Sequence, residues 1–285
     1  MRAAGHAPPA AAGTARHLVL GLETGGEHLS VALLESPIAS VALLESLPTG
    51  VRVVGELRAH RGSKHLDLML GLIAELLARA EVTPAELSLI AVGRGPGGFT
   101  GVRLGLSLAQ GLAIASGVPV WPVSSLAALA LNATLPGTAV LALLDAKKGE
   151  VYAAAYRLQE GAPPLTLLAP RAGTCESALA AAREASGRRP EGLPTAKLEG
   201  AHAAGDEDMK RLVVLGSGAL AYGVASALQP SAHVASATAT AQLALYEWAA
   251  AGMQASASPP VDAAYLRKSE AEVMADARDL AAQQR

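Results

Sequence analysis

The sequence has 285 residues, of which 51% are hydrophobic, and a net charge of -2, so a substantial core can be buried. No long run of Lys or Arg occurs, which excludes the charge pattern of a protein that grips nucleic acid by itself. The single cysteine, Cys175, excludes an internal disulfide and a thiolate metal cage, and it fits a reducing cytoplasm.

The first half of the chain predicts strands followed by strand and helix alternation. Residues 1–16 hold small residues and prolines without an apolar run, and we expect a disordered tail there. Apolar spacing and turn residues then predict strands at 17–23, 29–35 and 51–59, a helix at 64–80, a strand at 87–93 and a helix at 102–116. The run SVALLES occurs at 30–36 and again at 40–46, and we expect one copy to pair in the sheet.

The second half repeats this theme, which suggests two α/β domains of similar design at 17–117 and 118–268. Its predicted elements are a helix at 124–132, strands at 138–144 and 150–157, a helix near 175–185, a strand at 211–215 and helices after 218 and 238. Residues 185–210 are polar and are expected to form a mobile insertion, and residues 269–285 a C-terminal tail.

The segment from Leu104 to Leu144 contains no charged residue. Gln110, Asn132 and three prolines interrupt it, so no piece provides the ~20 apolar residues that cross a bilayer. We expect buried core here and no membrane association.

The loop GRGPGGFTGVRLG at 93–105 lies between a predicted strand and a helix, a geometry that points backbone N–H groups at an anion. It lacks the Lys of a phosphate-binding loop, and no acidic residue follows the next strand as in dinucleotide sites. Phosphate contact and simple close packing therefore both stay open.

The helices at 64–80 and 101–116 have more apolar surface than one core-facing stripe needs. Gly101, Gly105, Ala109 and Ala113 form a ridge of small residues that allows another backbone to approach. Either both helices are buried within their own chain, or they also pack against a partner.

The block GRGPGGFTGVRLGLSLAQGLA resembles the signature of the TsaB (YeaZ) family, with Gly98 where the family has Ser. Further matches are HLVLGLETGGEHLSVALLE, GSKHLDLMLGLI, VSSLAAL, LLDAKKGEVYAAAY and PVDAAYLR, so that the resemblance covers most of residues 17–268. It implies an α/β fold of two ribonuclease H-like domains, the type found in actin, sugar kinases and heat-shock chaperones.

The resemblance also implies a function. TsaB-like proteins are non-catalytic partners of the TsaD-like enzyme that makes threonylcarbamoyladenosine in tRNA. A TsaE-like ATPase is the third component, the isolated chain is expected to form a homodimer, and tRNA is contacted only indirectly. The implied partner interface consists of Lys64, His65, Leu68, Leu72, Gly101, Arg103, Leu104, Gly105 and Leu108.

The nucleotide cleft of this fold is expected to be vestigial, with Glu23, Thr24, Gly97, Gly98 and Asp145 around it. The family commonly has Asp-Thr-Ser where this chain has Glu23, Thr24 and Gly25, and the longer carboxylate is awkward for octahedral Mg²⁺. Asp145 is alternatively a turn residue at a strand end.

No catalytic metal or cofactor is expected. The two metal-binding histidines of TsaD-like enzymes are replaced by what look like Ser125 and Leu129, which disfavours a metallopeptidase. The remaining alternative is a small-molecule kinase or ATPase of the same fold, with Glu23 and Asp145 handling Mg²⁺.

Overall fold

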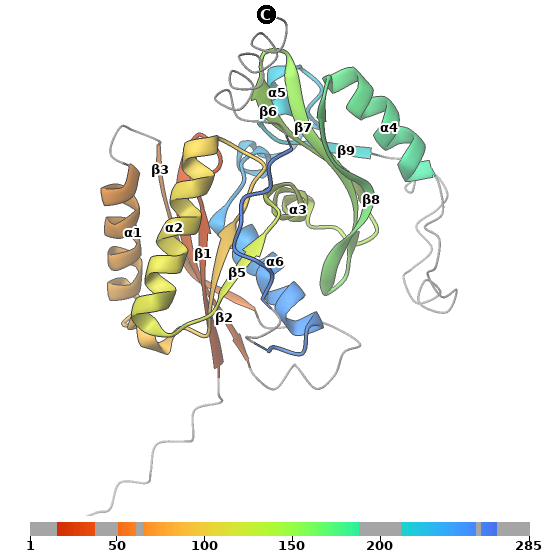
Figure 1. The fold of residues 1–285 in the computed structure, drawn as a ribbon. Helices are drawn as coiled ribbons and strands as arrows, with labels where there is room; N and C mark the ends of the chain where they lie inside the picture. Colours follow the sequence, from red (N-terminus) through yellow and green to blue (C-terminus); the bar gives the residue numbers. More distant parts are fainter. Residues whose placement is uncertain (1–15, 38–50, 61–64, 188–211, 255–257, 267–285) are drawn as a thin grey trace, which may run out of the picture.

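The computed structural model describes residues 16–37, 51–60, 65–187, 212–254 and 258–266, and the side chains of 65–67 are not described (Figure 1). The first SVALLES copy pairs in the sheet as part of a strand, as expected. The second copy, most of the expected insertion, residues 1–15 and the expected C-terminal tail lie outside the described residues. Arg16, the last residue of the expected N-terminal tail, begins a strand.

The first sheet has five strands in the order β3-β2-β1-β4-β5. Its strands are β1 (Arg16–Glu23), β2 (His28–Pro37), β3 (Arg52–His60), β4 (Leu89–Gly93) and β5 (Val120–Val123). β1, β2 and β3 form an antiparallel meander, whereas β4 and β5 run parallel to β1. Helices α1 (His65–Arg79) and α2 (Phe99–Ser116) lie side by side on one face (Figure 1).

The second sheet repeats the first with fewer strands, in the order β8-β7-β6-β9. Its elements are β6 (Ala139–Lys147), β7 (Glu150–Gln159), β8 (Ala162–Gly173), β9 (Leu212–Leu215), α4 (Cys175–Gly187) and α5 (Ser217–Ala221). Again three strands form an antiparallel meander and β9 runs parallel to β6. The repeated design of two mixed sheets flanked by helices confirms the expected α/β fold class.

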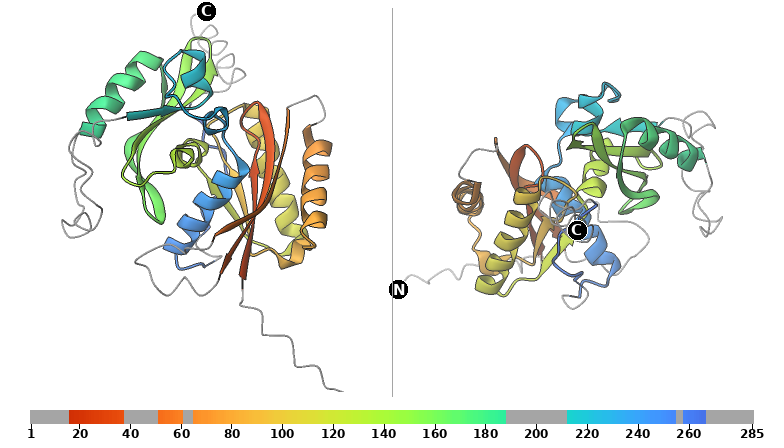
Figure 2. Two further views of the ribbon diagram at one scale, coloured as in Figure 1. Left: turned by 180° about the vertical axis from the view of Figure 1, so that it is seen from behind. Right: turned by 45° about the horizontal axis from the view of Figure 1, so that its top comes forward.

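Two helices, α3 (Ser125–Ala130) and α6 (Ala237–Ala250), lie between the sheets and join them through one core (Figure 2). Strand alternation sets this layering, since Leu18 and Leu20 point to α1 and α2 while Val19 points to the middle layer. At Gly21 the backbone of α6 comes so close that a Cβ would lie 2.2 Å from the carbonyl oxygen of Ala237.

Strands β5 and β8 are not among the elements expected from the sequence. β5 is the fifth strand of the first sheet although it follows the expected domain boundary at 117, and α6 from the C-terminal part packs on this same sheet. Three short 3-10 helices complete the described elements, at Pro84–Glu86, Leu131–Ala133 and Pro230–His233. Within the described part of the chain, no helix has the length and apolarity to cross a membrane.

Candidate functional site

The glycine loop connects β4 to α2 and packs against the turn that follows β1. The N–H of Gly98 donates to the carbonyl of Gly25 at 2.7 Å, and the N–H of Ser125 donates to the carbonyl of Gly95 at 2.9 Å. At Gly97 a Cβ would lie 2.7 Å from the carbonyl oxygen of Gly25. The loop glycines therefore serve close packing, one of the two roles left open by the sequence.

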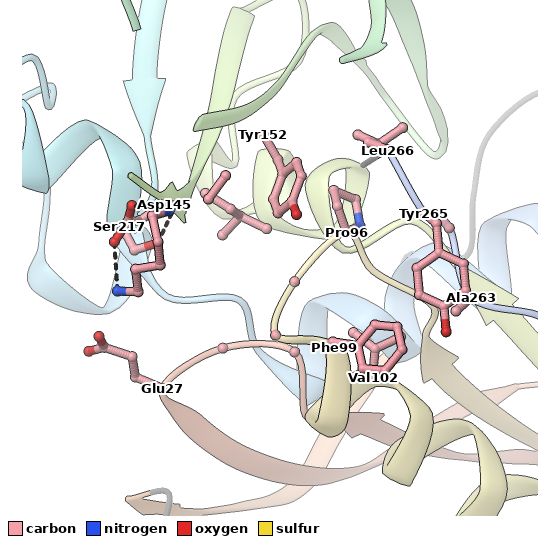
Figure 3. A pocket seen from close by; sticks show the side chains of 18 of the residues that line it. Glu27, Pro96, Phe99, Val102, Asp145, Tyr152, Ser217, Ala263, Tyr265 and Leu266 are labelled. Atoms are coloured by element: carbon pink, nitrogen blue, oxygen red, sulfur yellow. Dashed lines mark hydrogen bonds and ion pairs between the residues drawn. The ribbon is translucent and has the colours of Figure 1, made fainter. Parts of the chain in front are cut away.

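A cleft of about 370 Å³ opens above this loop (Figure 3). Gly97 and Gly98 line it from the loop, and Asp145, Lys147 and Ser217 line it from the second sheet and α5. Its two ends differ: Figure 3 shows Asp145, Ser217 and Glu27 at one end and Phe99, Tyr265 and Leu266 at the other. Gly97, Gly98 and Asp145 thus line the same cleft.

Glu23 lies beneath the cleft, which corrects the expectation that its carboxylate faces it. The side chain is fully buried at the end of β1. Its Oε1 accepts hydrogen bonds from the N–H groups of Thr24 at 3.0 Å and Gly25 at 2.8 Å. Its Oε2 accepts from the hydroxyls of Ser125 at 3.0 Å and Thr240 at 3.3 Å. Oε1 therefore holds the turn that follows β1, and Oε2 ties β1 to α3 and α6.

Burial raises the pKa of the Glu23 carboxyl, because the charged form loses its hydration, while the four hydrogen bonds oppose this shift. Gly93 in β4 makes the room for the carboxyl, since a Cβ there would lie 2.2 Å from Oε2. The geometry describes a structural pin rather than a ligand for a cation in the cleft.

Asp145 lies at the rim of the cleft and is paired within its own strand. Its Oδ1 accepts from the backbone N–H of Lys147 at 2.8 Å, and its Oδ2 accepts from the ammonium of the same lysine at 2.7 Å. Burial alone would raise the pKa of Asp145, but the hydrogen bonds and charge of Lys147 outweigh it and lower the pKa. This is the turn geometry that the sequence offered as the alternative for Asp145.

The inner face of α2 is covered by its own chain. Gly101, Gly105 and Leu108 are buried. The Thr24 hydroxyl donates to the Gly101 carbonyl at 2.8 Å, and a Cβ at Gly105 would lie 2.3 Å from that hydroxyl oxygen. The small-residue ridge thus receives the turn after β1, which corrects the expectation that these three residues meet a partner.

The other expected interface residues are placed differently. Arg103 is exposed on α2, and Leu104 is half-buried. Leu68 and Leu72 of α1 are half-buried and pack partly against the core beneath them. Lys64 and the side chain of His65 lie outside the described residues.

Sequence reasoning missed three exposed apolar side chains on this side of the sheet, on α1 and α2. Ile114 is 87% exposed, Leu70 is 44% exposed and Phe99 is 39% exposed. Phe99 is contacted by Arg103, whose guanidinium carbon lies 3.8 Å from the ring centroid. The surplus apolar surface of both helices and the position of Ile114 in the last turn of α2 are the sequence signals of this surface.

The structure also places the two positions compared with metal-binding histidines. Ser125 bonds to Glu23, and Leu129 is fully buried in the core around α3. Among the residues that the structure describes, no group of three or more His, Cys, Asp or Glu side chains is arranged to hold a metal ion.

Comparison with known proteins finds relatives in sequence and in fold. A family model described as TsaD, tRNA N6-adenosine threonylcarbamoyltransferase, matches residues 59–180. The tRNA threonylcarbamoyladenosine biosynthesis protein TsaB of Escherichia coli K12 is 39% identical over 99 residues, which are 34% of this chain and 43% of that protein. The protein of the same name from Bacillus subtilis 168 is 30% identical over 143 residues, 50% of this chain and 56% of that protein. The structure of YeaZ from Pseudomonas aeruginosa superimposes with a TM-score of 0.58 at 28% identity, covering 88% of this chain and 100% of that chain. The chain is similar to TsaB (YeaZ) proteins in sequence and in fold.

The chain spans about half the length of the curated TsaB relatives that it matches in sequence, and the structural match extends the likeness to the whole YeaZ chain. The likeness to YeaZ agrees with the expected α/β fold of two mixed sheets flanked by helices.

Proposed function

We propose that this chain is the non-catalytic scaffold and activator of a TsaD-type enzyme in the threonylcarbamoyladenosine modification of tRNA in the cytoplasm. The names of the TsaB relatives and the match to the TsaD family model support the pathway. The single observation that carries the mechanism is the exposed apolar surface on α1 and α2, with Ile114 87% exposed at its extreme. We take the exposed apolar side chains of these two neighbouring helices as the interaction surface.

The partner surface consists of the outer residues of the two helices, including Leu70, Arg103, Leu104 and Ile114. Burying them against a partner stabilises a complex by about 25 cal/mol per Å² of apolar area before association costs are subtracted. A TsaE-like ATPase joins this complex, tRNA is contacted through the catalytic subunit, and in isolation the same surface forms a homodimer.

Both carboxylates expected around the nucleotide cleft already have protein partners, which supports a non-catalytic role. Glu23 would have to give up four hydrogen bonds to reach a cation, and Asp145 would have to leave Lys147. The alternative, a kinase or ATPase, requires both changes. Calorimetric titration of the isolated chain with Mg-ATP separates the two, because turnover by this chain alone would contradict the scaffold role.

The interface is tested with Ile114→Glu and Leu70→Glu, measured as affinity for the TsaD-type partner and as threonylcarbamoyladenosine formed in tRNA by the reconstituted proteins. We expect each variant to weaken binding at least about tenfold, since a charge is buried in place of an apolar anchor. Leu220→Glu is the matched control, because Leu220 is an exposed leucine on a helix of the second unit, 56% exposed on α5.

The proposal fails if Ile114→Glu and Leu70→Glu bind the partner as tightly as the parent chain does. It also fails if Leu220→Glu weakens binding to the same degree, because the effect would then not belong to the surface of α1 and α2. Sedimentation of the isolated chain gives an independent measure, since Ile114→Glu is expected to convert the homodimer to a monomer.

A further inference from the structure

A strap of extended chain, residues 258–266, runs along the free edge of the first sheet (Figure 1). The hydroxyl of Ser258 donates to the carbonyl of Val120 in β5, the last strand of that sheet. Further along, the N–H of Ala264 donates to the carbonyl of Arg94 at 2.8 Å. The strap thereby reaches from the sheet edge to the glycine loop.

The far end of the strap is fastened to α2 by a cluster of three side chains, Phe99, Arg103 and Tyr265, which we call the latch. The Nε–H of Arg103 donates to the Tyr265 hydroxyl at 2.6 Å. The rings of Phe99 and Tyr265 lie with their centroids 5.4 Å apart, and the guanidinium stacks on Phe99. Tyr265 is 51% exposed, so the latch lies at the surface.

The latched strap forms one wall of the cleft. Ala263, Ala264, Tyr265 and Leu266 line the apolar end, where Figure 3 shows Tyr265 facing Phe99. Without this wall, the cleft would open along the side of α2. The position of the strap therefore sets the shape of the apolar end of the cleft.

The other contacts of the strap are weak enough for it to detach without unfolding the sheets. The ion pair of Arg94 with Asp262 is 3.4 Å long and the Asp262 side chain is 69% exposed, so it contributes little. Val261 and Ala263 are only half-buried against the core. Segments with few buried contacts open locally, well below the free energy of global unfolding.

We propose that residues 258–266 are a strap that opens the apolar end of the cleft when the latch breaks, and that the partner of α1 and α2 holds the latch closed. The second half of this statement rests on the proposed function. Phe99 and Arg103 belong to α2, so a partner on this helix covers the latch. A partner that binds over the closed latch needs no rearrangement of Phe99 and Tyr265. A partner that displaced Tyr265 would first have to break the contacts of Tyr265 with Phe99 and Arg103. In the free chain the latch can open and expose the apolar end of the cleft. In the complex the latch stays closed.

The latch is tested in the isolated full-length chain by hydrogen–deuterium exchange of a peptide that contains Ala264. Tyr265→Phe keeps the ring and removes the hydroxyl, so we expect exchange about three- to tenfold faster, the range for one net hydrogen bond. Arg103→Lys, which removes the Nε donor and the planar stack, is expected to act in the same direction. Tyr222→Phe is the matched control, since Tyr222 is an exposed tyrosine of the second unit.

Unchanged exchange of the strap in both latch variants would overturn the proposal. Faster exchange in β1 to the same extent would also overturn it, because opening would then be global. With the TsaD-type partner bound, exchange of the strap in the parent chain is expected to slow. If a complex forms without slowing, the closing role of the partner is wrong, whereas if no complex forms the proposed function fails and the latch result stands.

Discussion

Replacing Glu23 provides the sharpest test of how the two halves of the molecule are held together. The fully buried carboxyl accepts four hydrogen bonds, two from backbone N–H groups and two from the hydroxyls of Ser125 and Thr240. The two kinds of donor differ in their alternatives. A hydroxyl can rotate and accept instead of donating, whereas a backbone N–H can only donate.

This difference between hydroxyl and backbone N–H donors sets the expected loss in the free energy of unfolding for each substitution of Glu23. Glu23→Ala leaves the N–H groups of Thr24 and Gly25 without an acceptor, and each buried unsatisfied donor costs about 1–3 kcal/mol. We therefore expect a loss of roughly 3 kcal/mol in the free energy of unfolding, to which the space left beside Gly93 adds. Glu23→Gln retains Oε1 for both N–H groups and presents an NH₂ to hydroxyls that can turn, so its cost should be about 1 kcal/mol or less.

The assay is thermal and urea unfolding of the two variants and the parent chain. Given about 2–4 °C per kcal/mol for chains of this size class, the Ala variant should melt roughly 6–12 °C lower and the Gln variant within a few degrees of the parent. Equal losses in the two variants would refute the reasoning, because the negative charge itself would then be needed. A loss below about 1 kcal/mol in Glu23→Ala would refute the assignment of Glu23 as a pin.

Three further predictions concern stability. Because burial raises the pKa of Glu23, the folded chain keeps this proton to higher pH than the unfolded chain does, so its contribution is complete below the ordinary pKa and is lost as pH rises through the folded pKa. The free energy of unfolding of the parent relative to Glu23→Gln, measured by urea titration at several pH values, should fall across that window; a flat difference would contradict the raised pKa. Gly105→Ala should cost about 1–3 kcal/mol, since its Cβ meets the fixed Thr24 hydroxyl. By contrast, a Cβ at Gly111 in the same helix would face open space, so Gly111→Ala should raise the free energy of unfolding by up to about 1 kcal/mol. Thermal unfolding measures the effect of both glycine substitutions.

The strands that sequence analysis missed share a physical cause. β5 contains Pro122, and β8 contains Pro163, Pro164 and Pro170. Proline lacks an N–H and normally argues against a strand, but an edge strand pairs on one side only. Both β5 and β8 lie at the edge of their sheets. The strands with alternating or continuous apolar runs, such as β1, β4 and β6, are the ones that the pattern predicted.

In the candidate site, too, the sequence pattern predicts the position of the elements but not the contacts of their side chains. The sequence indicated that Glu23 ends a strand and that the glycine loop follows another, and both positions are confirmed. The partners of its carboxyl, Ser125 and Thr240, lie 102 and 217 residues away in the chain. No local pattern specifies such contacts, and the same holds for the pairing of Arg103 with Tyr265. Periodicity therefore predicts where the loops of the cleft lie, but it does not predict which side chains find hydrogen-bond partners around the cleft.

Helix α2 shows which substitutions can test partner binding without disturbing the fold. In the structure Gly101, Gly105 and Ala109 of its small-residue ridge are buried and Ala113 is half-buried. Its polar residues Arg103, Ser107 and Gln110 are exposed. Thr24 of the same chain packs against this ridge. Its hydroxyl lies so close to Gly105 that there is no room for a Cβ at that position. A Gly105→Leu variant that lost partner binding would therefore report damage to the packing of this turn, not to an interface. Only substitutions on the outer surface, such as Ile114→Glu, separate partner binding from folding, because Ile114 is 87% exposed in the folded chain.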